Sequence, residues 1–111
     1  MRMRWRNFKI GRMIFSEIMG QIMTIHIETI NTNTYKVRIE SRSTTEHTVT
    51  VSPEYVQKLT QGYSDAIKLI EKSFEFLLER EPNTSILRSF ELSVIDRYFP
   101  EYEREISKRL G

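Results

Sequence analysis

The feature that most constrains the fold of this 111-residue chain is a change in the spacing of its apolar residues after Val51. Before that point three stretches alternate apolar and polar residues, as strands with one buried face do: Thr24–Ile30, Thr34–Glu40 and His47–Val51. After it the period becomes about 3.6, which is the period of amphipathic helices. The sequence therefore predicts an α+β fold, in which a three-stranded antiparallel β-meander is followed by three to four α-helices packed on one sheet face.

Strand parity assigns the side chains of the meander to two faces. One face collects apolar residues for a core: Ile25, Ile27, Tyr35, Val37, Ile39, Val49 and Val51. The other face would be open to solvent or to a polar partner and holds His26, Glu28, Lys36, Arg38, Glu40, Thr48 and Thr50. Lys36 and Arg38 are the residues after position 22 that resemble a basic patch. The candidate partner-binding residues on this face are Lys36, Arg38, Thr48 and Thr50.

Two helices are predicted directly after the meander. Ser52 caps the first, with Pro53 at its first position, and Gly62 ends it. Ser64 then caps a longer helix, whose core-facing band is predicted to be Ile67, Ile70, Phe74, Leu77 and Leu78. Phe76 falls off that band and is a candidate for exposure.

The last third of the chain predicts further helices and an aromatic cluster. A helix capped by Thr84 or Ser85 is expected to run through Phe90 and to restart at Ser93, and Pro100 opens the last helix. Aromatic residues on both sides of that proline are further candidate partner-binding residues, because such residues are enriched at protein interfaces: Tyr98, Phe99 and Tyr102. The other explanation, and the ordinary one for aromatic residues at such positions, is that they pack between helices.

Charge is divided unevenly between the first 22 residues and the rest. Residues 1–22 contain five Lys or Arg residues against the single acid Glu17, whereas residues 23–111 contain twelve against fourteen Asp or Glu. The formal net charge of +2 therefore comes from a basic N-terminal arm. We predict that residues 23–111 form a single α+β domain that is slightly acidic.

Three interpretations of the arm remain open. Apolar residues recur in it at three- and four-residue steps, at Ile10, Met13, Ile14, Ile18 and Ile22. This spacing fits a basic amphipathic helix lying on an anionic membrane surface, and the Arg-rich, acid-poor composition fits a targeting peptide. In the third interpretation residues 1–22 come from an upstream start choice, or form a tail, before a domain that begins at Met23.

The sequence contains no recognisable catalytic or metal-binding arrangement. The absence of cysteine excludes a thiol nucleophile and thiolate zinc, and fits a cytoplasmic location. The two histidines, His26 and His47, are expected to point to opposite faces of the sheet. The four glycines form no phosphate loop, and no apolar stretch approaches the ~20 residues needed to cross a bilayer. We therefore expect a protein that is not an enzyme, holds no metal or cofactor and does not span a membrane.

The order of elements in the middle of the chain resembles that of ribbon-helix-helix repressors and antitoxins. A strand and short helix over His47–Leu59 are followed by a turn at Gly62 and a helix over Asp65–Glu81. In that family the strand pairs with its copy in a dimer, and its outward side chains enter the major groove. The resemblance implies a homodimer in which Thr48 and Thr50 face the bases.

Two other segments are similar to a group of short uncharacterised prokaryotic proteins. They are Ser73–Leu87, which reads SFEFLLEREPNTSIL, and Val94–Tyr102, which reads VIDRYFPEY. Those chains begin close to where Met23 stands here, which supports treating residues 23–111 as the domain. The resemblance implies no activity.

These observations predict a small, non-enzymatic binding or regulatory module whose partner is a protein. A slightly acidic body weakens the electrostatic attraction that dominates DNA affinity, so a ribbon-helix-helix-like DNA-binding regulator or antitoxin is the alternative. A third hypothesis is a peripheral membrane protein held by residues 1–22.

Overall fold

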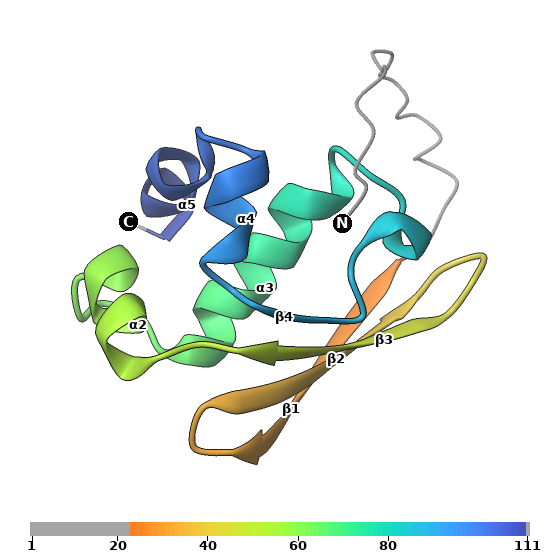
Figure 1. Cartoon of the computed structure of the whole chain (residues 1–111), viewed down its shortest axis with the longest axis horizontal. Helices are drawn as coiled ribbons and strands as arrows, with labels where there is room; N and C mark the ends of the chain where they lie inside the picture. The colour runs from red at the N-terminus through yellow and green to blue at the C-terminus, as the bar shows by residue number, and fades with distance from the viewer. Residues whose placement is uncertain (1–22, 111) are drawn as a thin grey trace.

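The computed structural model describes residues 23–110. The predictions made for the arm, residues 1–22, concern residues outside this described range. The elements are β1 (Thr24–Asn31), β2 (Thr34–Glu40), β3 (Thr45–Thr50), α2 (Pro53–Thr60), α3 (Ala66–Leu78), the 3-10 turn η1 (Asn83–Ser85), β4 (Ser89–Glu91), α4 (Val94–Tyr98) and α5 (Tyr102–Leu110). The strands form one sheet, and the helices lie on one side of it (Figure 1). None of the helices in the described part of the chain is long and apolar enough to cross a membrane.

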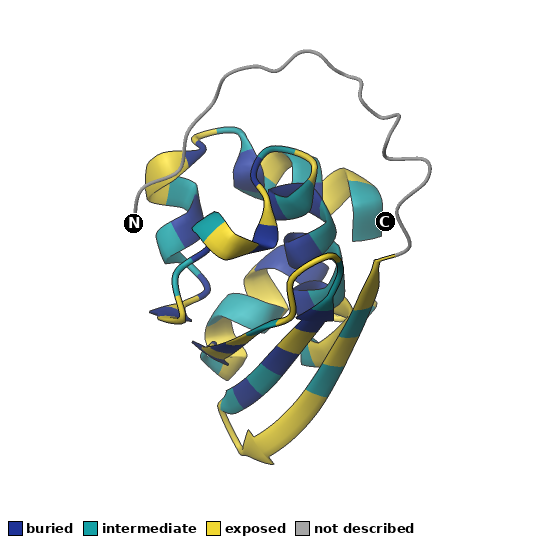
Figure 2. Cartoon of the chain, turned by 90° about the vertical axis from the view of Figure 1, so that its right-hand side faces the viewer, coloured by how far each residue is buried: buried dark blue, intermediate teal, exposed yellow. Residues whose placement is uncertain are grey.

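The predicted antiparallel meander is confirmed for β1, β2 and β3. Both strand pairs are antiparallel, with Ile27 opposite Val37 and Val37 opposite His47. Burial alternates as strand parity predicts, since Tyr35, Val37 and Ile39 are buried while Arg38 between them is exposed. Figure 2 shows this banding along the strands.

The prediction of a three-stranded, wholly antiparallel sheet is wrong, because a fourth strand joins β3. The four strands stand in the order β1-β2-β3-β4, and β4 runs parallel to β3. Thr48 N donates to Arg88 O at 2.7 Å, and Leu92 N donates to Thr50 O at 2.8 Å. The segment expected to be a third helix thus becomes η1 and β4, because it satisfies the backbone groups along the second edge of β3.

The core lies between the sheet and α3, and it continues between α3 and the C-terminal helices. Phe74 faces the sheet, where its ring lies 5.7 Å from that of His47 and 6.0 Å from that of Phe90. Phe76 is also fully buried, so the expectation that it is exposed is wrong. A helix that packs on two sides needs a wider apolar face than one stripe provides. Ile67, assigned to the core band, is 41% exposed.

Two predictions about helix caps have different outcomes. Ser52 caps α2 as predicted, since its side chain accepts a hydrogen bond of 3.1 Å from Tyr55 N. Asp65, rather than Ser64, caps α3, because its carboxylate accepts from Lys68 N at 2.9 Å. A carboxylate at this position also interacts favourably with the helix dipole.

Candidate binding surface

The face of the sheet opposite the helices, called the open face here, contains the sheet residues selected from the sequence. Cross-strand pairing places Lys36 between Glu28 and Thr48, while Thr50 lies opposite Glu91 of β4. Thr48 and Thr50 are exposed, and the side chain of Arg38 is 50% exposed. The structure therefore places Lys36, Arg38, Thr48 and Thr50 together on one surface.

Carboxylates outnumber Lys and Arg on the open face. Arg38 Nε lies 3.3 Å from Glu40 Oε2, and His26 Nε2 lies 3.7 Å from Glu40 Oε1. Arg38 is also flanked by Glu46 on β3. The strands contribute the carboxylates Glu28, Glu40, Glu46 and Glu91, against the cations Lys36 and Arg38. This face consequently lacks the excess positive charge that a DNA-binding surface uses.

The arrangement implied by the ribbon-helix-helix resemblance is absent from β3. That resemblance requires the strand carrying Thr48 and Thr50 to pair with its copy. In the structure β3 has β2 on one side, and β4 pairs with its residues 48–50 on the other, so the stretch that carries Thr48 and Thr50 has no free edge for such pairing. Thr48 and Thr50 point outward as the resemblance implies, but from an interior strand.

The outer edge of β1 is the long strand edge that residues 23–110 leave unpaired. Val51 N donates to Asn33 O at 3.0 Å, so odd-numbered residues of β2 direct their backbone groups toward β3. In an antiparallel sheet the even-numbered residues of β2 then bond to β1. It follows from the pairing register that Ile25, Ile27 and Thr29 direct their N–H and C=O groups toward the outer edge.

Apolar side chains lie along the same strand. Ile25 and Ile27 are half-buried at the margin of the core, and Ile30 is 49% exposed. Most residues of β1 are exposed, and Figure 2 shows the strand at the margin of the sheet. Strand alternation predicts the apolar residues Ile25 and Ile27, and the predicted meander order places this strand at an edge of the sheet.

The predicted C-terminal aromatic surface is not present, because two of its three residues are in the core. Phe99 and Tyr102 are fully buried, whereas Tyr98 is 42% exposed. Phe76 packs edge-on against Phe99 and Tyr102, with ring centroids 5.8 and 5.4 Å away. The alternative of packing between helices is therefore correct for Phe99 and Tyr102.

His47 is buried and is held in place by hydrogen bonds from both of its ring nitrogens. Its Nδ1 donates to Leu87 O at 2.7 Å, because a carbonyl oxygen can only accept. In the neutral ring Nε2 then accepts from the Thr45 hydroxyl at 2.9 Å, and the Thr45 oxygen accepts from Asn83 Nδ2 at 2.9 Å. Burial lowers the pKa of His47, the Leu87 hydrogen bond opposes this, and nearby Arg88 adds to the lowering. Both ring nitrogens are thus engaged, and within residues 23–110 no three His, Cys, Asp or Glu residues are grouped to hold a metal ion.

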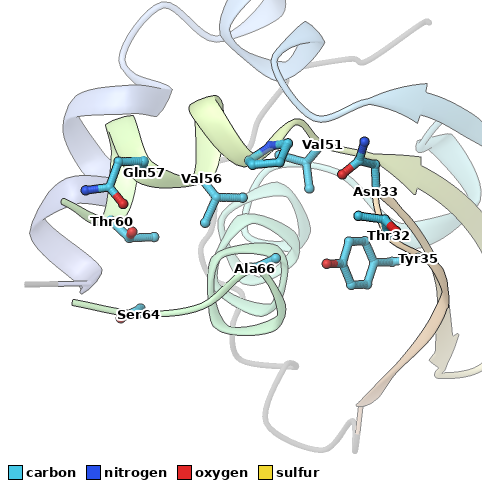
Figure 3. Close-up of a pocket in the computed structure, with 10 residues that line it drawn as sticks. Thr32, Asn33, Tyr35, Val51, Val56, Gln57, Thr60, Ser64 and Ala66 are labelled. Carbon is cyan, nitrogen blue, oxygen red and sulfur yellow. The ribbon is translucent and has the colours of Figure 1, made fainter. Parts of the chain in front are cut away.

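A small hollow lies between the β1–β2 turn, α2 and the start of α3 (Figure 3). Its volume is about 230 Å³, below the roughly 300–1,000 Å³ of typical ligand pockets. The Tyr35 ring points from β2 toward Ala66, and the polar lining groups come from uncharged residues such as Asn33, Gln57 and Thr60. Sequence reasoning did not anticipate this hollow, whose walls come from segments far apart in the chain.

Comparison with known proteins gave no match to a family model, to a curated protein or to a solved structure.

Proposed function

We propose that this chain is a non-enzymatic protein-binding module whose partner docks on the sheet side, against the outer edge of β1 and the adjoining open face. The observation that carries the proposal is the arrangement of layers, since α2 to α5 all lie on one side of the sheet (Figure 1). Within residues 23–110 this leaves one face and the edge of β1 uncovered. An uncovered edge binds extended segments through main-chain hydrogen bonds.

The chemistry of the open face supports a protein partner. Its charges are mixed, with Lys36 and Arg38 interspersed among glutamates. A mixed pattern complements another mixed surface and selects among partners by charge register. A polyanion such as DNA would meet more carboxylates than cations there.

The position of His47 does not suit a catalytic base. A general base needs an accessible nitrogen within hydrogen-bond reach of a substrate. His47 is 1% exposed and uses both ring nitrogens in internal hydrogen bonds. His26 is exposed on the open face, where its Nε2 lies 3.7 Å from Glu40 Oε1.

Site-specific photo-crosslinking in the cell tests the docking surface. A photoreactive amino acid replaces Glu28 on β1 or, as a control, the exposed Arg104 on α5. We expect discrete protein adducts from position 28 and none from position 104. Thr29→Pro should remove the adducts, because it deletes an edge-facing N–H while leaving the β1–β2 hydrogen bonds intact. Equal adducts from both positions, or adducts that persist with Thr29→Pro, would refute the proposed surface.

Duplex DNA is the competing partner to eliminate. Fluorescence anisotropy of labelled duplex with the full-length chain, at near-physiological salt, should show no binding that depends on Lys36 and Arg38. If binding is present and is abolished by combined Lys36→Glu and Arg38→Glu, the chain is a DNA-binding protein and our proposal is wrong.

A further inference from the structure

The edge of β1 and the order of its side chains favour one particular occupant, a second copy of this chain. We propose that two chains pair their β1 strands antiparallel, with Ile27 opposite Ile27 of the second copy. The two sheets then become one continuous sheet across a two-fold axis. This inference rests on the proposed function, because it names the partner of that same surface.

The backbone of β1 supports this pairing. Ile25, Ile27 and Thr29 direct their N–H and C=O groups outward, as the register within the chain requires. Centring the pair on Ile27 places Ile25 opposite Thr29 of the second copy, and the reverse. Each outward residue then meets another outward residue, which gives about six main-chain hydrogen bonds in one self-complementary interface.

The side chains select the register. Pairing about Ile27 places His26 opposite Glu28 of the second copy twice, once on each side of the axis. These are non-hydrogen-bonded positions, where Cα atoms lie about 4.5 Å apart and side chains are closest. An imidazole N–H and a carboxylate are then donor and acceptor. A pair centred on His26 would place the two His26 side chains opposite each other. A pair centred on Glu28 would place two carboxylates opposite each other, which is destabilising.

The length of β1 also favours it over the other outer strand. β1 has eight residues and contains no proline, whereas β4 at the opposite edge has three. Ile27 is half-buried on the helix-facing side, and in the pair it would cover Ile27 of the second copy. Extending the sheet through β1 therefore adds apolar contact together with hydrogen bonds.

Light scattering and sedimentation of the full-length chain test the proposal. We expect a dimer, and we expect His26→Glu to weaken it at least about tenfold, since like charges then oppose each other at two symmetric positions. Combining His26→Glu with Glu28→Lys should restore dimerisation, because the carboxylate introduced at position 26 would face the ammonium group introduced at position 28 of the second copy. Gln57→Glu introduces the same negative charge at an exposed position of α2 and should leave the dimer unchanged. Circular dichroism checks that each variant folds.

Engineered cysteines test the register directly, since the sequence has no cysteine of its own. His26→Cys chains are mixed with Glu28→Cys chains under mild oxidation. Facing non-hydrogen-bonded positions meet the Cα separation of roughly 4.4–6.8 Å that a disulfide requires. Cross-linked dimer should therefore form faster in the mixture than with either variant alone. Equal or faster cross-linking of one variant alone would overturn the register about Ile27.

A full-length chain that stays monomeric at high micromolar concentration would overturn the second copy as occupant. A dimer that His26→Glu leaves unchanged would also overturn it, since another surface would then mediate dimerisation. A dimer that His26→Glu weakens but the added Glu28→Lys does not restore would refute the pairing of positions 26 and 28. The dimer proposal and the proposed function can be told apart. A monomer whose position 28 still cross-links to a different protein, in a manner abolished by Thr29→Pro, would refute the dimer and support the docking surface.

Discussion

A buried pair of hydroxyl groups joins α3 to α5, and its replacement tests whether Tyr102 belongs to the core. Ser73 Oγ donates to Leu69 O at 2.7 Å and lies 2.6 Å from the Tyr102 hydroxyl oxygen. The single proton of the Ser73 hydroxyl is therefore committed, so Tyr102 must be the donor to Ser73. Both residues are fully buried, and burial is the main reason that the pKa of Tyr102 is raised.

The two single replacements should have unequal costs. Tyr102→Phe removes the donor but leaves Ser73 bonded to Leu69, which should cost about 1 kcal/mol of unfolding free energy. Ser73→Ala removes the acceptor and leaves a buried hydroxyl without a partner, which should cost about 2 kcal/mol. The double variant leaves no unmatched group. Its cost should be smaller than the sum of the two by about 1 kcal/mol.

Urea unfolding of the full-length chain, followed by circular dichroism, measures all four corners of this cycle. If Tyr102→Phe costs more than Ser73→Ala, or the two costs add, the donor assignment is wrong. If both replacements are neutral, Tyr102 is not in the core. The C-terminal aromatic surface would then have to be considered again.

Further replacements test three other parts of the fold. Burial lowers the pKa of His47, so as the pH falls below about 6.5 the unfolded chain takes up a proton on this imidazole before the folded chain does. Urea unfolding should therefore show the free energy of unfolding declining below that pH. His47→Gln should remove this part of the pH dependence. Asp65→Ala should cost about 1 kcal/mol and Ser64→Ala much less, in thermal and urea unfolding; equal costs would contradict the cap assignment. Phe76→Ala should cost roughly 3–5 kcal/mol in urea unfolding, as expected for a buried aromatic; a near-neutral result would mean that Phe76 is exposed.

The parts of the fold that the sequence predicts correctly depend on local patterns. Alternation places Val37 and Ile39 inside and Arg38 outside, because adjacent strand residues face opposite sides of the sheet. The Ser52-Pro53 pair marks the start of α2 through groups within one helical turn.

The parts that it misses depend on contacts between distant segments. Residues 86–90 have apolar spacing that fits a helix. The segment nevertheless forms β4, because its backbone hydrogen-bonds to β3. Phe76 is off the stripe of a helix with one buried face, but α3 has neighbours on two sides. Strand spacing identified the members of the open face. The predicted meander correctly places β1 at an edge, but it also places β3 at an edge, because the pairing of β4 depends on a segment about forty residues further along the chain.

The distribution of internal contacts supports our choice of the sheet side, rather than the helical side, as the proposed docking surface. On the helical side charged groups already bind one another: Arg109 lies 2.6 Å from Glu79, Lys58 lies 3.3 Å from Glu103, and Arg80 lies 3.4 Å from Glu101. The Arg80 guanidinium also stacks over Phe76 at 3.6 Å. Each exposed pair contributes only about 0–1 kcal/mol, but a partner binding there must rearrange several of them for every contact it gains. At the edge of β1 a partner would gain main-chain hydrogen bonds from backbone groups that the sheet of residues 23–110 leaves unpaired, at the cost of the exposed His26–Glu40 contact, and this supports the proposed docking on the sheet side.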